Sequence, residues 1–220
     1  MELGSSQIGY FGDSSYAWPR NRQDGLLEIE LPVNGVPPAA TRHNDLHRSN
    51  VLVGDIPPFG EHGIAPILKI IDFGRATELD LGETTGVQSN VHAIGRLMLS
   101  MITMSSRSIF SIPSDKHDVL VYNGQNIPTY AKGILPPFPG GPRPFPWLDE
   151  WLATLVALCM ATDGNNRPNL QALSVWVPYS VRERTAEFYG IPTETNHAIQ
   201  QLCETIIHNA PPPQMISGPR

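Results

Sequence analysis

The sequence predicts a mainly α-helical, loop-rich fold with one small β-hairpin. Apolar residues recur every three or four positions over residues 90–104, 147–162 and 196–209, a spacing typical of helices with an apolar face. Two short runs rich in β-branched residues, 51–53 and 67–71, flank a segment rich in Pro and Gly and therefore predict a hairpin. Pro and Gly supply 22 and 19 of the 220 residues, so we expect much of the chain to be loop.

The bulk composition argues against several classes of protein. A net charge of −6 and an isoelectric point near 5.6 disfavour binding to nucleic acid or to an anionic membrane. No apolar run is long enough to span a membrane, and the first twenty residues lack the pattern of a secretory signal. Cys159 and Cys203 both lie in apolar helical patterns and are expected to be reduced. We therefore expect a cytoplasmic or nuclear protein that is not secreted.

Three residues with oxygen donors flank the predicted hairpin. Asp45 and Asn50 precede its first strand, and Asp72 directly follows its second strand. Pairing the two strands would set Asn50 and Asp72 side by side, because one enters the hairpin where the other leaves it. Carboxylate and amide oxygens are ligands that Mg²⁺ accepts in phosphoryl-transfer sites. The predicted hairpin would therefore bring hard oxygen ligands, of the kind that hold magnesium, together at one point.

The residues around this site match a longer motif. They are His43, Asp45, Leu46, Asn50, Val51 and Leu52 and, after an apolar strand, Asp72, Phe73 and Gly74. This pattern resembles the catalytic loop and the Asp-Phe-Gly motif of the protein kinase superfamily. The resemblance implies the kinase C-terminal lobe as the fold, with ATP and Mg²⁺ as cofactors. It also implies that Asp45 orients the substrate hydroxyl and that Asn50 and Asp72 hold magnesium.

Two departures from the kinase pattern leave the substrate open. Asn44 stands where most protein kinases have Arg, and His47 stands where serine/threonine kinases have a Lys near the transferred phosphoryl group. The form Asp-Leu-His-x-x-Asn also resembles the aminoglycoside and choline kinases, so His47 remains a catalytic candidate beside Asp45. The alternating His43, Asp45 and His47 could instead hold a metal ion on a strand, but this reading leaves Asn50 unexplained.

Three further residues are expected to support the site, namely His43, Asn90 and Arg167. Asn90 begins the predicted helix 90–104, which resembles the central helix of the kinase lower lobe, where an Asp bonds the catalytic-loop backbone. Arg167 followed by Pro168 resembles the end of that lobe, where the Arg pairs with the Glu of an Ala-Pro-Glu triplet. That triplet is missing here, so Arg167 must find another acid, a backbone carbonyl or water.

The sequence divides into three expected regions. Residues 1–42 contain no lysine and no G-x-G-x-x-G, so we expect an irregular segment in place of the kinase upper lobe. Residues 43–187 form the kinase-like C-terminal lobe, and 188–220 form a helix and a disordered tail. Without the glycine loop and the lysine, the chain by itself is expected to bind Mg-ATP weakly or not at all and to be an inactive, truncated lobe.

Two loop-rich regions complete the prediction. Residues 75–89 read as a short activation segment with three hydroxyls, Thr84, Thr85 and Ser89. Residues 105–146 carry many prolines and read either as an irregular lid or as a Pro-rich docking segment. Within them, residues 119–122 before Asn123 and Gly124 predict a short extended piece and a turn.

Three functions from different classes remain open on the sequence. The first is a protein-kinase-like phosphotransferase, moving phosphate from ATP to a protein hydroxyl. The second is a pseudokinase-type interaction module that keeps the fold without catalysis. The third is a small-molecule kinase of the aminoglycoside or choline type, favoured by His47 and disfavoured by Arg167 with Pro168. The protein substrate or interaction partner is unknown.

Overall fold

Helices dominate the computed structural model, which describes residues 41–54, 56, 65–80, 83–104, 118–131, 133–138 and 140–209. Within these residues the fold is mainly helical and loop-rich with small strand pairs, as predicted. Four predicted features lie outside the described residues: nearly all of the N-terminal segment 1–42, most of the hairpin turn, residues 105–117 of the Pro-rich region, and the tail after residue 209.

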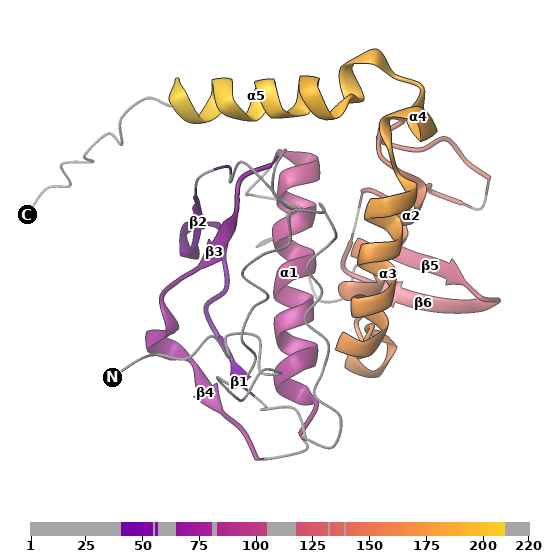
Figure 1. The fold of residues 1–220 in the computed structure, drawn as a ribbon. Helices are drawn as coiled ribbons and strands as arrows, with labels where there is room; N and C mark the ends of the chain where they lie inside the picture. Colours follow the sequence, from indigo (N-terminus) through magenta and orange to yellow (C-terminus); the bar gives the residue numbers. More distant parts are fainter. Residues whose placement is uncertain are drawn as a thin grey trace, which may run out of the picture. The chain divides into compact units, whose positions relative to one another are not determined.

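The chain divides into two compact units. Of the described residues, 41–52 and 70–175 belong to the first unit, and 53–69 and 176–209 belong to the second. In the first unit, α1 (Thr85–Thr103) contacts β1 (Thr41–Arg42) on one side and α2 (Glu150–Cys159) on the other (Figure 1). The helix α1 is therefore the element on which the rest of this unit is built.

The contact between α1 and α2 forms a small core. Val87 and Val91 of α1 are buried against Cys159 of α2. Gly95 allows the two helices to approach closely, since a Cβ added there would lie 2.8 Å from Cγ of Met160 and 2.9 Å from Cβ of Cys159. Both distances are shorter than ordinary van der Waals contact, so this position requires glycine.

The predicted start of α1 was wrong. The helix begins at Thr85 rather than at Asn90, so Thr85 and Ser89 are helical and the loop after Arg75 is shorter than expected. The physical reason is Val87, which lies one turn before Val91 and buries its side chain in the same core. Asn90 consequently lies inside the helix and is buried, where its side chain cannot cap the helix.

The predicted bounds of α2 were also too wide. Its first turn is capped by Asp149, whose Oδ1 accepts from the N–H of Leu152 at 2.9 Å, and Trp147 before it is exposed. At the other end the backbone turns away to pair with a strand, because the N–H of Thr162 donates to the carbonyl of Pro128 at 2.9 Å. This pairing competes with another helical turn and ends the helix at Cys159.

Two strand pairs follow the sequence prediction. β2 (Val51–Val53) pairs with β3 (Leu68–Ile70), which confirms the predicted hairpin. β5 (Asp118–Tyr122) and β6 (Gln125–Thr129) pair antiparallel across Asn123 and Gly124, which both have positive φ as a two-residue hairpin turn requires. This second hairpin confirms the predicted extended piece and turn, and it contacts α2.

A third strand pair was not predicted. β1 pairs antiparallel with β4 (Thr77–Glu78), with Thr41 opposite Glu78 and Arg42 opposite Thr77. Each of these strands has only two residues, so neither carries a periodic pattern that sequence analysis could detect. The pair joins the chain just before His43 to the chain just after Arg75.

The C-terminal helices include α3 (Leu170–Glu183), which spans the boundary between the two units, α4 (Ala186–Tyr189) and α5 (Asn196–His208). α5 confirms the predicted last helix, and its first turn is capped by Thr195. On its predicted apolar side Leu202 and Ile206 remain exposed. None of the helices in the described part of the chain is long and apolar enough to cross a membrane.

Candidate functional site

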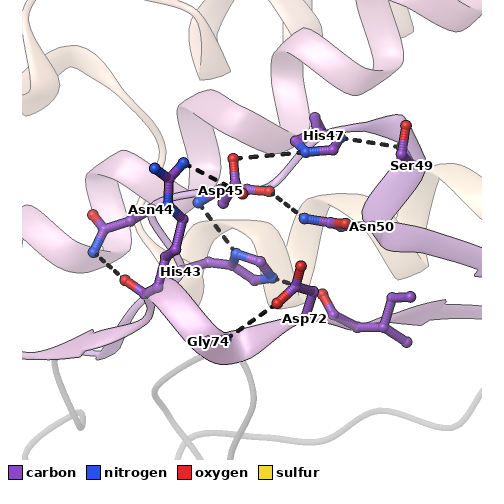
Figure 2. Close-up of polar contacts among 10 residues, drawn as sticks. His43, Asn44, Asp45, His47, Ser49, Asn50, Asp72 and Gly74 are labelled. Carbon is purple, nitrogen blue, oxygen red and sulfur yellow. Dashed lines mark hydrogen bonds and ion pairs between the residues drawn. The ribbon is translucent and has the colours of Figure 1, made fainter. Parts of the chain in front are cut away.

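The two loops that carry the predicted site residues are joined by their backbones. The N–H of Ile71 donates to the carbonyl of Asn50 at 2.9 Å, directly next to the paired strands β2 and β3. Asp72 therefore follows immediately after a residue that is hydrogen-bonded to Asn50, and Figure 2 shows the side chains of Asp45, Asn50 and Asp72 around His43. The structure brings these three predicted residues into one neighbourhood.

His43 is buried at the centre of this neighbourhood and contacts both loops. Its Nε2 lies 3.2 Å from the carbonyl of Ile71, and its Nδ1 accepts from the N–H of Asp45 at 3.3 Å (Figure 2). A carbonyl can only accept, so Nε2 must carry the hydrogen and the ring is the neutral Nε2–H tautomer. The ring also packs against Phe73, with 4.7 Å between the centroids. His43 thus connects the loop containing Asp45 to the loop containing Asp72.

Asn90 fastens the first loop to α1. Its Oδ1 accepts from the N–H of His43 at 3.0 Å, and its Nδ2 donates to the carbonyl of Thr41 at 2.8 Å. Both ends of the amide are used, and the side chain is buried. Asn90 therefore holds the backbone at the entry to the loop, on either side of Arg42.

Asn44 contributes a further link that sequence reasoning missed. Its Nδ2 donates to the carbonyl of Arg75 at 2.9 Å (Figure 2). The same nitrogen lies 3.0 Å from Oγ1 of Thr77. Asn44 has a φ of 63°, and Asn is one of the few residues that adopt this left-handed conformation readily. The sequence held one clue to this link, namely an Asn at the position where the kinase pattern has Arg. Asn readily adopts the left-handed backbone conformation that residue 44 has.

The carboxylate of Asp45 lies between two cationic or ionisable groups. Its Oδ1 is 3.6 Å from Nε2 of His47, and its Oδ2 is 3.6 Å from Nη1 of Arg75. Both contacts are longer than hydrogen bonds and partly exposed, so they add little to stability. Arg75 was not among the predicted site residues, although it directly follows the Asp-Phe-Gly triplet.

His47 is oriented by its own loop. Its Nδ1 accepts from the N–H of Ser49 at 3.2 Å and caps the short 3₁₀ helix η1 (Arg48–Asn50). Nε2 is therefore the nitrogen that carries hydrogen and faces Asp45. The local cap therefore fixes the orientation of the His47 ring beside Asp45.

Asn50 and Asp72 each have a side-chain oxygen that accepts no hydrogen bond from the described residues. Nδ2 of the buried Asn50 donates to the backbone carbonyl of Asp45 at 2.8 Å, which leaves Oδ1 as an acceptor. Asp72 is exposed, has a φ of 63°, and accepts a long 3.4 Å bond from the N–H of Gly74 on Oδ1. Among the described residues no group of three or more His, Cys, Asp or Glu could hold a metal ion.

Arg167 lies at a distance from this cluster along the chain and satisfies its guanidinium with carbonyls. Nε donates to Ala161 at 2.9 Å and Nη1 to Gln88 at 3.0 Å, with a longer 3.5 Å contact from Nη2 to Thr162. This outcome is one of the three predicted alternatives. Arg167 ties the chain after α2 to the first turns of α1, which carry Asn90.

No protein-family model, no curated protein and no solved structure matches this chain. The arrangement combines a carboxylate between His47 and Arg75, two oxygen donors on neighbouring loops, and a buried histidine that joins those loops.

A pocket of about 220 Å³ opens beside Asp45. It lies between residues 42–47 and one face of α1, and its lining includes Arg42, His92 and Arg96. Burial, with the positive charges of Arg167 and Arg96, lowers the pKa of His92 to about 4. The ring of His92 packs edge-on against Tyr130. Arg42, His92 and Arg96 were not among the predicted site residues.

Proposed function

We propose that this chain carries the lower-lobe catalytic elements of a protein-kinase-like phosphotransferase. In this proposal Asp45 orients the acceptor hydroxyl, and Asn50 with Asp72 holds magnesium. The observation that supports it best is the buried His43, whose two nitrogens contact the loop of Asp45 and the loop of Asp72. A metal-site histidine would need a free nitrogen lone pair, and His43 has none left.

The donor set of Asn50 and Asp72 suits magnesium. Both supply hard oxygens, and the amide of Asn50 is oriented by its bond to Asp45 so that Oδ1 remains as the acceptor. Two protein ligands are enough for this ion, which usually keeps several waters and the substrate phosphates in its shell. When bound, magnesium would neutralise charge on the ATP phosphates.

A non-catalytic, pseudokinase-type module is the second candidate, and a specific observation favours it. Residues 1–42 contain no lysine and no glycine-rich phosphate loop, so the groups that hold the triphosphate in kinases are not in this sequence. The isolated chain should therefore bind Mg-ATP weakly or not at all. Calorimetric titration that gives a micromolar dissociation constant for Mg-ATP would contradict this expectation.

The metal assignment is tested with Mn²⁺ as a paramagnetic substitute for Mg²⁺. NMR spectra of the chain should show line broadening centred on the amides around Asn50 and Asp72. Asp72→Asn should abolish most of this broadening, because it removes the only carboxylate of the proposed ligand pair. Asp80→Asn is the matched control, since Asp80 is an exposed acid in the same unit. Equal broadening in the Asp72 and Asp80 variants would refute the site.

A further inference from the structure

The described residues that line the pocket beside Asp45 include more positive than negative side chains. Arg42 and Arg96 both line it, and Asp45 is the one carboxylate among these described lining residues. That carboxylate also faces His47 and Arg75, each at 3.6 Å, so its charge is already partly compensated. The described part of the lining therefore places two arginines beside Asp45, in a chain whose net charge is −6.

The size of the pocket limits what can occupy it. At about 220 Å³ it is smaller than the roughly 300–1,000 Å³ of sites for drug-sized ligands. A single side chain that ends in a phosphoryl or carboxylate group fits this volume. Ser89 of α1 also lines the pocket and supplies a hydroxyl donor, so the lining offers both charge and a neutral hydrogen bond.

We propose that this pocket binds the anionic side chain of an acceptor peptide, in which an acidic or phosphorylated residue lies next to the hydroxyl that receives phosphate. This inference rests on the proposed function, because it uses Asp45 as the residue that orients the hydroxyl. Since Asp45 belongs both to the candidate catalytic loop and to the pocket lining, a peptide with its hydroxyl at Asp45 has its neighbouring side chain at the pocket. Guanidinium groups favour phosphate and carboxylate because their N–H donors match the spacing of two oxygens.

The test is a binding measurement that contains neither nucleotide nor metal. The full chain is titrated by NMR with a short peptide in which serine is followed by phosphoserine, and with the same peptide carrying asparagine in that position, at about 0.15 M ionic strength. The phosphoserine peptide should bind more tightly and shift the amides of residues 42–47 and 89–96. Arg42→Gln and Arg96→Gln should each weaken binding of the phosphoserine peptide about tenfold or more.

Arg182→Gln is the matched control, because Arg182 is exposed on α3 and does not line the pocket. Ala93→Phe is a second variant, since Ala93 lines the pocket and a larger side chain fills it without changing the charge. It should also weaken binding, with a far-UV circular dichroism spectrum like that of the wild type. Equal affinity for the two peptides, an equal effect of Arg182→Gln, or equal affinity for inorganic phosphate would each overturn the proposal. Because magnesium is left out, the result is independent of the Asp72 experiment.

Discussion

The backbone N–H of His43 donates to Oδ1 of Asn90 at 3.0 Å, although the two residues are 47 positions apart in the sequence. The side-chain amide of Asn90 also donates from Nδ2 to the carbonyl of Thr41 at 2.8 Å. One side chain from the second turn of α1 thus fixes the start of the candidate catalytic loop. The ring nitrogens of His43 in turn contact the carbonyl of Ile71 and the N–H of Asp45, so the position of His43 also affects both of these loops.

Asn90→Ala should destabilise the chain by about 1–3 kcal/mol, because it leaves the buried N–H of His43 and the partly buried carbonyl of Thr41 without this partner. Urea unfolding followed by circular dichroism measures this change. Asn166→Ala is the matched control, since Asn166 is exposed in the 3₁₀ helix η3 (Gly164–Asn166). Similar losses in the two variants would show that the Asn90 contacts are not important for stability.

Asn90→Asp should not behave as a conservative change. The carboxylate keeps an acceptor for His43 but sets its second oxygen against the carbonyl of Thr41, where Nδ2 now donates. We expect a loss of stability close to that of Asn90→Ala. A variant as stable as the wild type would mean that the carboxyl turns or that the loop relaxes around it.

Arg167→Lys should destabilise the chain by about 2–3 kcal/mol even though it preserves the charge. One ammonium group cannot replace a planar fork that contacts carbonyls at Ala161, Thr162 and Gln88. Hydrogen exchange should show faster opening of the first turns of α1. Arg182→Lys, at an exposed site, serves as the control and should leave both measurements unchanged.

Gly95→Ala should destabilise the chain by about 1–3 kcal/mol through overpacking, although Ala is the better helix former. The added methyl group would meet Met160 and Cys159 at distances under 3 Å. A double-mutant cycle with Met160→Ala tests the cause. The two changes should be less than additive, because removing the Met160 side chain makes room for the methyl group.

Stability should fall as the solution is acidified from about pH 6.5 to about pH 4, through His92. The pKa of His92 is lowered from 6.5 to about 4, chiefly by burial, so the unfolded chain takes up the proton first. The contribution of His92 to the free energy of unfolding is complete above pH 6.5. It is lost as the pH falls toward about 4, the pKa of His92 in the folded protein. The magnitude is at most about 3 kcal/mol, and solvent screening of this partly exposed ring reduces it.

Urea unfolding of wild type and His92→Gln at pH 4.5, 5.5 and 7 measures this dependence. The variant should lose less stability on acidification, because the titrating group is gone. His197→Gln controls for the removal of a histidine, since His197 is exposed on α5. Parallel pH profiles for wild type and His92→Gln would assign the acid sensitivity to other groups.

The two cysteines should differ in reactivity toward a thiol reagent at pH 8. Burial raises the pKa of the Cys159 thiol to about 12, so almost none of it is thiolate and the reagent has no access. Cys203 is only partly buried. Native Cys203→Ser should therefore react hardly at all and should gain one reactive thiol in urea. Rapid labelling of native Cys203→Ser would contradict the buried position of Cys159.

Sequence patterns predicted the elements whose signals are local. The hairpin of β2 and β3 follows from two β-branched runs around a turn, and α5 follows from apolar spacing after Thr195. The turn at Asn123 and Gly124 was predicted because these residue types tolerate positive φ. Boundaries were less accurate, as at Thr85, because burial of Val87 against α2 extends α1 beyond the expected cap.

The residues of the candidate site also fall into two groups, those that the sequence indicated and those that only the folded structure identified. The residue types Asp45, Asn50 and Asp72, and their order, were readable as a motif, since the chemistry of an oxygen donor belongs to the side chain itself. The role of Asn44 was not readable, because it depends on a carbonyl that is distant in the sequence. Asn90 was expected from the kinase resemblance to bond the loop backbone, but the particular N–H and carbonyl that it contacts were not readable. The pocket between the loop and α1 was missed for the same reason.

The sequence by itself therefore determined a mainly helical chain with one hairpin, a short extended piece with a turn, and an ordered set of oxygen donors. Only the tertiary structure decided that Asn90 also bonds the carbonyl of Thr41, that Arg167 bonds carbonyls, and that Arg42 and Arg96 share a pocket with Asp45. The physical reason is that periodicity and turn chemistry act over a few residues, whereas a buried amide or guanidinium takes whatever partner the packed helices bring within hydrogen-bonding distance.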